Sequence, residues 1–237
     1  KPTHLLISAV SWDHADVYPT EESYLTAFKK LFALVPKTGL IVGCTDTEKL
    51  SSMLIQTKRE YISYGKNDSA IYRYENVKQT NDGLSFDIIY HGKTYYIESP
   101  LLGTYNAENI TGCFAMAREI GIAPGDITDA IKKFHGIKRR LEKRYENKTT
   151  VIDDLAHSPE KAKFVLKTLR DIYSGKIIAI YEPNSGNRTE QSNLQYKNAF
   201  ENADQVIIPR LSKLKIDPRD PEKIFDGEDL SRIIGET

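Results

Sequence analysis

Acidic and histidine side chains gather directly after a stretch that is predicted to be a buried strand. Residues 5–10 are mostly apolar, and Asp13, His14 and Asp16 follow in the next loop. Ligands of α/β folds bind at the carboxyl ends of strands, and carboxylates with an imidazole can hold a divalent metal ion. A solvated loop gives the same spacing, and on spacing alone this simpler interpretation is favoured.

Two asparagines, Asn106 and Asn109, stand three residues apart at the predicted start of a helix. This spacing places both side-chain amides on one face of the helix. An amide donates and accepts hydrogen bonds together, which suits the edge of a purine base. An ordinary asparagine cap is the alternative.

The second half of the chain offers three further binding positions. Arg140 ends the basic run 138–140, and a guanidinium binds phosphate through paired hydrogen bonds. Asp154 and His157 follow a predicted strand, where a carboxylate can bind a ribose hydroxyl. Arg188 ends a glycine-containing loop and could hold a carboxylate or a phosphate. A basic linker, a capped helix with a structural histidine, and a plain loop are the respective alternatives.

The apolar pattern predicts the elements that must position these residues. Strands and helices alternate at first, with strands at 5–10, 40–43 and 60–64 and helices at 20–35 and 45–54. An antiparallel meander follows, with strands at 70–77, 84–90 and 94–98. Two helices are predicted next, at 106–120 and 126–134. The alternation then returns, with strands at 150–153, 176–181 and 205–208 and helices at 159–172 and 190–202. The fold class is therefore α/β, and the last part is expected to form a mostly parallel sheet.

The composition excludes several classes of partner. Lys and Arg together number 33, and so do Asp and Glu, so the formal net charge is zero. No overall field would attract nucleic acid or an anionic membrane. Two cysteines, Cys44 and Cys113, make neither a disulfide framework nor a cysteine-rich zinc site. No apolar run is long enough to span a membrane, and we expect a cytoplasmic protein.

The order of the motifs resembles the central and C-terminal domains of the Mur ligases, over roughly residues 5–210. The series consists of Asp-His-x-Asp, Gly-x-x-Asn-x-x-Asn, Gly-x-x-Arg-Arg-x-Glu, Asp-Asp-x-x-His-x-Pro, and a Glu-Pro loop that ends in Arg-Thr. The resemblance implies that residues 1–137 form the C-terminal part of a central ATP-binding domain of ATPase type. Residues 138–237 would form a Rossmann-like domain, and both domains are expected to be truncated.

The resemblance also implies ATP and Mg²⁺ as cofactors, with a role for each candidate residue that contacts them. His14 would help to hold the magnesium ion. Asn106 and Asn109 would lie against the adenine, Arg140 near the phosphates, and Asp154 at the ribose.

His157 and Arg188 would face the incoming amino acid or peptide. The chemistry implied is phosphorylation of the carboxylate of UDP-N-acetylmuramate by ATP, followed by attack of an amine on the acyl phosphate. Within the family, residues 13–17 and the loop 181–185 favour the branch that adds the tripeptide L-alanyl-γ-D-glutamyl-meso-diaminopimelate. The branch that adds L-alanine is the alternative, since the Arg-Thr spacing in the last loop fits it better.

Three departures from the family pattern limit these expectations. The sequence has no Gly-x-x-Gly-Lys-Thr/Ser phosphate loop, Ala9 stands where the family usually has Asn, and Tyr105 where His is often found. We therefore expect that the chain alone does not turn over substrate. Other interpretations are a different branch such as folylpolyglutamate synthetase, which the Asp-Asp-x-x-His-x-Pro run disfavours, and a nucleotide- or peptide-binding module without catalysis.

Overall fold

The chain forms two units in this computed structural model, which describes residues 2–12, 17–184, 187–211 and 225–235. The first unit is Lys1–His135 and the second is Gly136–Thr237, and each is described by itself. The assignment of residues 1–137 and 138–237 to an ATP-binding domain and a Rossmann-like domain remains a proposal, because the division of the chain gives neither unit a role.

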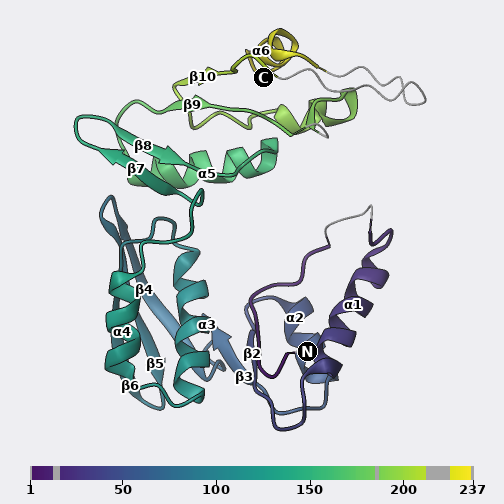
Figure 1. The fold of residues 1–237 in the computed structure, drawn as a ribbon, viewed down its shortest axis with the longest axis vertical. Coiled ribbons are helices and arrows are strands. Elements are labelled where there is room, and N and C mark those ends of the chain that lie inside the picture. The colour runs from purple at the N-terminus through teal and green to yellow at the C-terminus, as the bar shows by residue number, and fades with distance from the viewer. Residues whose placement is uncertain (1, 13–16, 185–186, 212–224, 236–237) are drawn as a thin grey trace. The chain divides into compact units, whose positions relative to one another are not determined.

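The first unit is built on a six-stranded sheet whose strands lie side by side in chain order (Figure 1). The strands are β1 (Leu5–Ile7), β2 (Ile41–Cys44), β3 (Ile62–Gly65), β4 (Tyr72–Thr80), β5 (Gly83–Tyr90) and β6 (Lys93–Ser99). Strands β1 to β4 pair in parallel, and β4 to β6 pair antiparallel. The predicted meander is confirmed.

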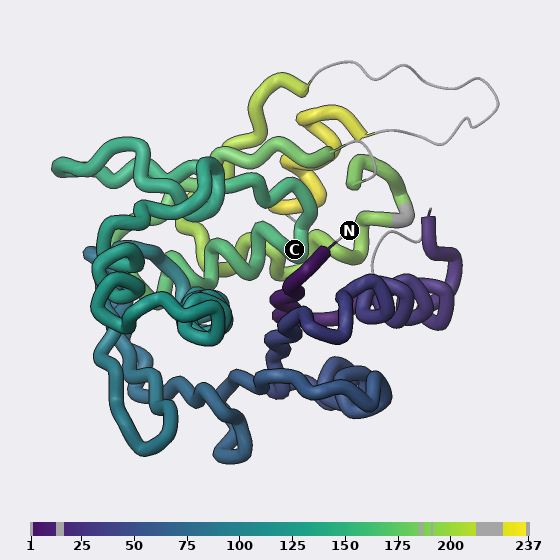
Figure 2. The backbone as a smooth tube through the Cα atoms, turned by 60° about the horizontal axis from the view of Figure 1, so that its bottom comes forward, coloured from purple at the N-terminus to yellow at the C-terminus, as the bar shows by residue number. Residues whose placement is uncertain are grey.

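Four helices belong to this unit: α1 (Glu21–Leu34), α2 (Glu48–Gln56), α3 (Asn106–Glu119) and α4 (Pro124–Lys133). Figures 1 and 2 both show α1 and α2 at one end of the unit and the meander with α4 at the other. Thr20 caps α1 as its sequence predicts, since its hydroxyl accepts from the Ser23 backbone N–H at 3.2 Å. None of the described helices is long and apolar enough to cross a membrane.

Helix α3 packs tightly against the sheet. Phe114 is fully buried, and its ring contacts those of Tyr72 and Tyr95 at centroid distances of 6.2 and 5.2 Å. At Gly112 the helix is so close to β3 that an added Cβ would lie 2.7 Å from the Tyr64 ring. This contact sets the distance between helix and sheet, because the Tyr64 side chain is fully buried and has no room to move aside.

The second unit contains two separate pairs of strands. Its elements are β7 (Glu142–Glu146), β8 (Thr150–Asp153), α5 (Pro159–Ile172), β9 (Ile178–Ile180), the 3₁₀ helix η2 (Glu190–Tyr196), β10 (Gln205–Ile207) and α6 (Gly227–Gly235). Strands β9 and β10 pair in parallel, as expected for a Rossmann-like sheet. Strand β8 pairs antiparallel with β7, a strand that the sequence did not predict.

The predicted α-helix at 190–202 is wrong. A 3₁₀ helix occupies Glu190–Tyr196 and ends there. Asn198 has a φ of +56°, which an α-helix does not allow. Buried Tyr196, Ala199 and Phe200 supplied the apolar pattern, and they pack into the core of this unit from an irregular segment.

The close approach at Gly112 predicts opposite effects for two glycine-to-alanine substitutions in the first unit. Alanine favours a helix over glycine by about 1 kcal/mol, but Gly112→Ala also introduces overpacking, which costs about 1–3 kcal/mol. We expect Gly112→Ala to lower the free energy of unfolding of this unit. A Cβ added at Gly125 in α4 has no atom within 4 Å, so Gly125→Ala should leave the free energy of unfolding unchanged or raise it slightly. Hydrogen exchange of peptides from β2 and α3 measures both, and equal stability of the two variants would contradict the packing argument.

A second prediction concerns Asp204 and acid stability. Its carboxylate accepts from the Ile177 backbone N–H at 2.7 Å and from Arg170 Nη2 at 2.6 Å. The Ile177 hydrogen bond and then Arg170 lower the pKa of Asp204. The stabilisation is therefore present above the unfolded-state pKa of about 3.9 and is lost as the pH falls through the folded-state value.

Asp204→Asn should consequently lower the melting temperature of the second unit at pH 7, and the difference from the native chain should shrink in acid. Asp171→Asn is the control, because Asp171 makes only a loose, exposed ion pair with Lys167 at 3.8 Å. A difference for Asp204→Asn that is the same at every pH would rule out the electrostatic explanation.

Candidate functional site

The first turn of α3 brings the two predicted asparagines together. Asn109 Nδ2 donates to Asn106 Oδ1 at 3.3 Å, and Asn106 Nδ2 donates to the Leu102 carbonyl at 2.8 Å. Asn106 therefore ties the helix to the preceding loop, while Asn109 is exposed at the surface of this unit. Because each amide has more than one hydrogen-bonding position, the pair can present a donor and an acceptor to a planar ligand.

The meander holds the loop before α3 in place. Gly103 has a φ of +95° and donates its backbone N–H to Gln79 Oε1 at 2.7 Å. Gln79 Nε2 in turn donates to the Gly83 carbonyl at 2.7 Å, at the turn between β4 and β5. Gln79 was not singled out from the sequence, since a lone glutamine in a strand carries no signal of a partner 24 residues away.

Asp154 organises the segment that contains Arg140. Its Oδ2 accepts from the Leu141 backbone N–H and its Oδ1 from that of Ala156, each at 2.8 Å. Arg139 and Leu141 have φ values of +60° and +45°, a left-handed conformation that needs support from its surroundings. Asp154 supplies part of that support, and the side chain of Arg140 between them is exposed.

His157 stands in the loop between β8 and α5 with one ring nitrogen engaged. Nδ1 lies 2.8 Å from the Leu155 carbonyl, and since a carbonyl only accepts, Nδ1 carries the proton. In the neutral ring, Nε2 is then the acceptor. The next residue, Ser158, caps α5 by accepting from the Lys161 backbone N–H at 3.4 Å, so His157 lies directly before the start of that helix.

Arg188 is buried, with 7% of its surface exposed. Its Nε donates to the Phe225 carbonyl at 2.9 Å, and the Phe225 backbone N–H donates to the Arg188 carbonyl at 2.6 Å. The same loop contacts His157, whose carbonyl accepts from the Asn184 backbone N–H at 3.1 Å and from Asn187 Nδ2 at 3.4 Å. The backbones of the His157 loop and the Arg188 loop are thus joined.

Two groups of residues remain: one that the structure does not describe, and one that the sequence analysis did not single out. His14, with Asp13 and Asp16, lies outside the described residues. The structure adds Cys44 and Asp46, which meet Glu108 near the start of α3. A signal for this pair was present, because Cys44 ends the second buried strand and Asp46 follows it, just as His14 follows the first in the sequence.

Taken by itself, each unit presents side chains of the types that contact nucleotides or amino acids. The first unit offers paired amides beside a helix N-terminus. The second offers an exposed guanidinium, a carboxylate with remaining lone pairs, and an imidazole nitrogen that can accept a proton. These groups suit binding and proton transfer.

Sequence comparison identifies both parts of the chain. Residues 1–117 match the family described as the Mur ligase middle domain, and residues 139–233 match the Mur ligase glutamate ligase domain. UDP-N-acetylmuramate–L-alanine ligase of Pelotomaculum thermopropionicum is 32% identical over 210 residues, which cover 87% of this chain and 46% of that protein. The chain spans about half the length of the curated relatives it matches.

Solved structures agree on the fold. The UDP-N-acetylmuramate–alanine ligase of Thermotoga maritima has a TM-score of 0.71 at 23% identity, and the match covers 87% of this chain and 45% of that one. A MurF ligase from Thermotoga maritima in complex with ADP has a TM-score of 0.66 at 14% identity, with 87% and 48% covered. At these identities the likeness shows the fold alone. The two domain matches follow one another over most of the sequence, and the chain belongs to the Mur ligase family.

Proposed function

We propose that this chain forms part of an ATP-dependent, ADP-forming ligase that joins L-alanine to UDP-N-acetylmuramate. The observation that carries the proposal is the 32% identity, through both domains, to a protein named UDP-N-acetylmuramate–L-alanine ligase. The residues of the segment 13–17 and of the loop 181–185 had favoured the tripeptide L-alanyl-γ-D-glutamyl-meso-diaminopimelate as the added group, whereas the Arg-Thr spacing fitted L-alanine better. The names of the curated relatives favour the alternative, L-alanine, and we adopt it.

The proposed reaction has two steps. The γ-phosphoryl group of ATP is transferred to the carboxylate of UDP-N-acetylmuramate, which forms an acyl phosphate and releases ADP. The amine then attacks the acyl carbon, the carbon–oxygen bond to phosphate breaks, and the amine loses a proton as the amide forms. Positioning and neutralisation of charge carry most of such phosphoryl transfer.

In the first unit, we assign Asn106 and Asn109 to the adenine of ATP. The exposed amide of Asn109 uses one N–H for its bond to Asn106, so its oxygen and its second N–H can meet a base edge, and Asn106 is itself fixed to Leu102. Magnesium bound with ATP would neutralise charge on the phosphates. His14, proposed to help hold that ion, lies outside the described residues.

In the second unit, we assign Arg140 to the phosphates of ATP and Asp154 to its ribose. Each Asp154 oxygen already accepts one backbone N–H, and a carboxylate oxygen has a second lone pair for a hydroxyl. We assign His157 and Arg188 to the incoming amine substrate. Nε2 of His157 can accept a proton from the attacking amine, and the hydrogen bond from Arg188 Nε to the Phe225 carbonyl fixes the guanidinium of Arg188.

The proposal is tested by ADP release from the full-length gene product with ATP, Mg²⁺ and UDP-N-acetylmuramate, with L-alanine and the tripeptide offered in turn. We expect release that depends on L-alanine. Release that depends on the tripeptide would overturn the choice of substrate. If the protein is folded and releases no ADP with either substrate, a binding module without catalysis would be favoured.

The adenine assignment predicts a specific weakening of nucleotide binding. Asn109→Ala removes one hydrogen bond worth about 0.5–1.5 kcal/mol, so the dissociation constant for ADP should rise roughly 2- to 10-fold. Gln56→Ala at the end of α2 is the control, since it removes an exposed amide elsewhere in the same unit. Calorimetry on the full-length gene product measures both variants. Equal affinities for ADP would show that Asn109 does not contact the base.

A further inference from the structure

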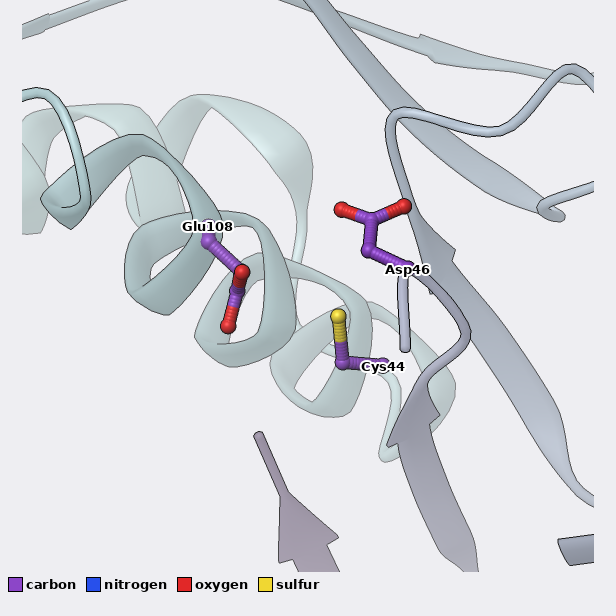
Figure 3. A group of neighbouring side chains, drawn as sticks. All are labelled: Cys44, Asp46 and Glu108. Carbon is purple, nitrogen blue, oxygen red and sulfur yellow. The ribbon is translucent and has the colours of Figure 1, made fainter. Parts of the chain in front are cut away.

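A thiol and two carboxylates from separate segments of the first unit meet at the carboxyl end of β2. Cys44 is the last residue of that strand, Asp46 follows two residues later, and Glu108 stands in the first turn of α3. Cys44 Sγ and one oxygen of each carboxylate all lie within 4.8 Å of one another. Figure 3 shows the three side chains converging from the strand, the loop and the helix.

The backbone around Asp46 is built to hold its carboxylate. Oδ1 accepts from the backbone N–H groups of Lys66 and Asn67, at 2.7 and 3.3 Å. Gly65 has a φ of +152°, and a Cβ there would lie 2.3 Å from the same oxygen. Because Gly65 has no side chain, its backbone can pass close to the Asp46 carboxylate. The two hydrogen bonds use only Oδ1, and Oδ2 takes no part in them.

Cys44, like Asp46, is held in place by its surroundings. It is 1% exposed and pairs with Tyr64 in the parallel ladder of β2 and β3. The sheet therefore fixes the backbone of Cys44, and burial limits how far Sγ can move. Glu108 has the longer side chain and a partly buried position, so it is the group that can adjust its distance to a ligand.

Two carboxylates, Asp46 and Glu108, lie close together in this cluster. The Cys44 thiol is hydrogen-bonded to the side chain of Glu108. The Lys66 ammonium lies over the Tyr74 ring, 5.6 Å from its centroid. A divalent ion at the centre of the cluster would reduce the repulsion between the carboxylates and would replace the hydrogen bond between Cys44 and Glu108 by bonds to the metal.

We propose that Cys44, Asp46 and Glu108 bind a divalent transition-metal ion of the Zn²⁺ class. Zinc bonds to sulfur at about 2.3 Å and to carboxylate oxygen at about 2.0–2.2 Å. The ligand atoms of a tetrahedral site then lie roughly 3.3–3.7 Å apart, which a rotation of Glu108 can reach from the observed spacing. A thiolate selects zinc or cobalt over magnesium, so this site is distinct from the magnesium that accompanies ATP.

The site would stabilise the start of α3. It joins the end of β2, the loop after it and the first helical turn through one ion, and Glu108 lies between Asn106 and Asn109 in that turn. An ion that binds only the folded chain raises its stability by mass action. This effect requires no nucleotide, so it stands or falls separately from the proposed ligase activity.

Cobalt titration of the untagged 237-residue chain tests the site, since a thiolate bound to Co²⁺ gives a near-ultraviolet charge-transfer band and a carboxylate does not. We expect saturation at one ion per chain, displacement by Zn²⁺ and no displacement by Mg²⁺. Cys44→Ser should abolish the band. Glu108→Gln should weaken cobalt affinity by about 10-fold or more, because even indirect partners of metal ligands contribute about 10–100-fold.

Cys113→Ser is the matched control, because Cys113 is the other cysteine of the chain and is exposed on α3, the helix that contains Glu108. It should keep the band and the affinity. Absence of the band from the folded native chain would overturn the proposal, as would its loss in Cys113→Ser alone. If Cys44→Ser does not fold by circular dichroism, Glu108→Gln decides, and an unchanged affinity in that variant contradicts the site.

Discussion

The close approach of α3 to the sheet at Gly112 determines where the candidate residues of the first unit lie. The helix rests on Tyr64 without a side chain between them, and Tyr64 is itself fully buried in β3. Because this contact fixes the helix relative to the strands, its first turn meets the carboxyl end of β2. The paired amides and Glu108 thus share one turn of helix, which lies beside Cys44 and Asp46. A second support comes from Gln79, which ties the preceding loop to the meander.

In the second unit, the candidate residues also stabilise their own loops. Asp154 holds two backbone N–H groups, and Arg188 holds the backbone of Phe225. A structural role and a ligand-binding role are therefore not exclusive at these positions. A side chain that is already fixed loses little conformational freedom when it meets a ligand, which favours binding and catalysis in a defined geometry.

The sequence predicted the parts of the fold that depend on local patterns. Turn residues indicated the meander, Thr20 indicated the start of α1, and the motif order indicated the family. Strand β7 was missed because Glu142–Glu146 is charged and becomes a strand only through pairing with β8. The burial of Arg188 depends on Phe225, 37 residues later in the chain. Cys44 and Glu108 are separated even further, and no local pattern connects them.

The branch of the family was harder to predict than the family itself. Most of the motifs have proposed roles at ATP, which would be common to every branch, so their order indicates the family. In the proposed reaction, the choice between L-alanine and a tripeptide would depend on the shape of the amine site, which these motifs do not describe. Similarity along both domains favoured L-alanine, whereas the residues of two segments, 13–17 and 181–185, had favoured the tripeptide.

The central claim is that the full-length gene product activates a carboxylate by phosphorylation before an amine attacks it. The most direct measurement follows a heavy-oxygen label placed in the carboxylate of UDP-N-acetylmuramate, with ATP, Mg²⁺ and L-alanine present. The account predicts one labelled oxygen in the inorganic phosphate that is released, together with unlabelled ADP. Label in AMP would indicate an adenylate in place of an acyl phosphate, and phosphate without label would show that the carboxylate is never phosphorylated.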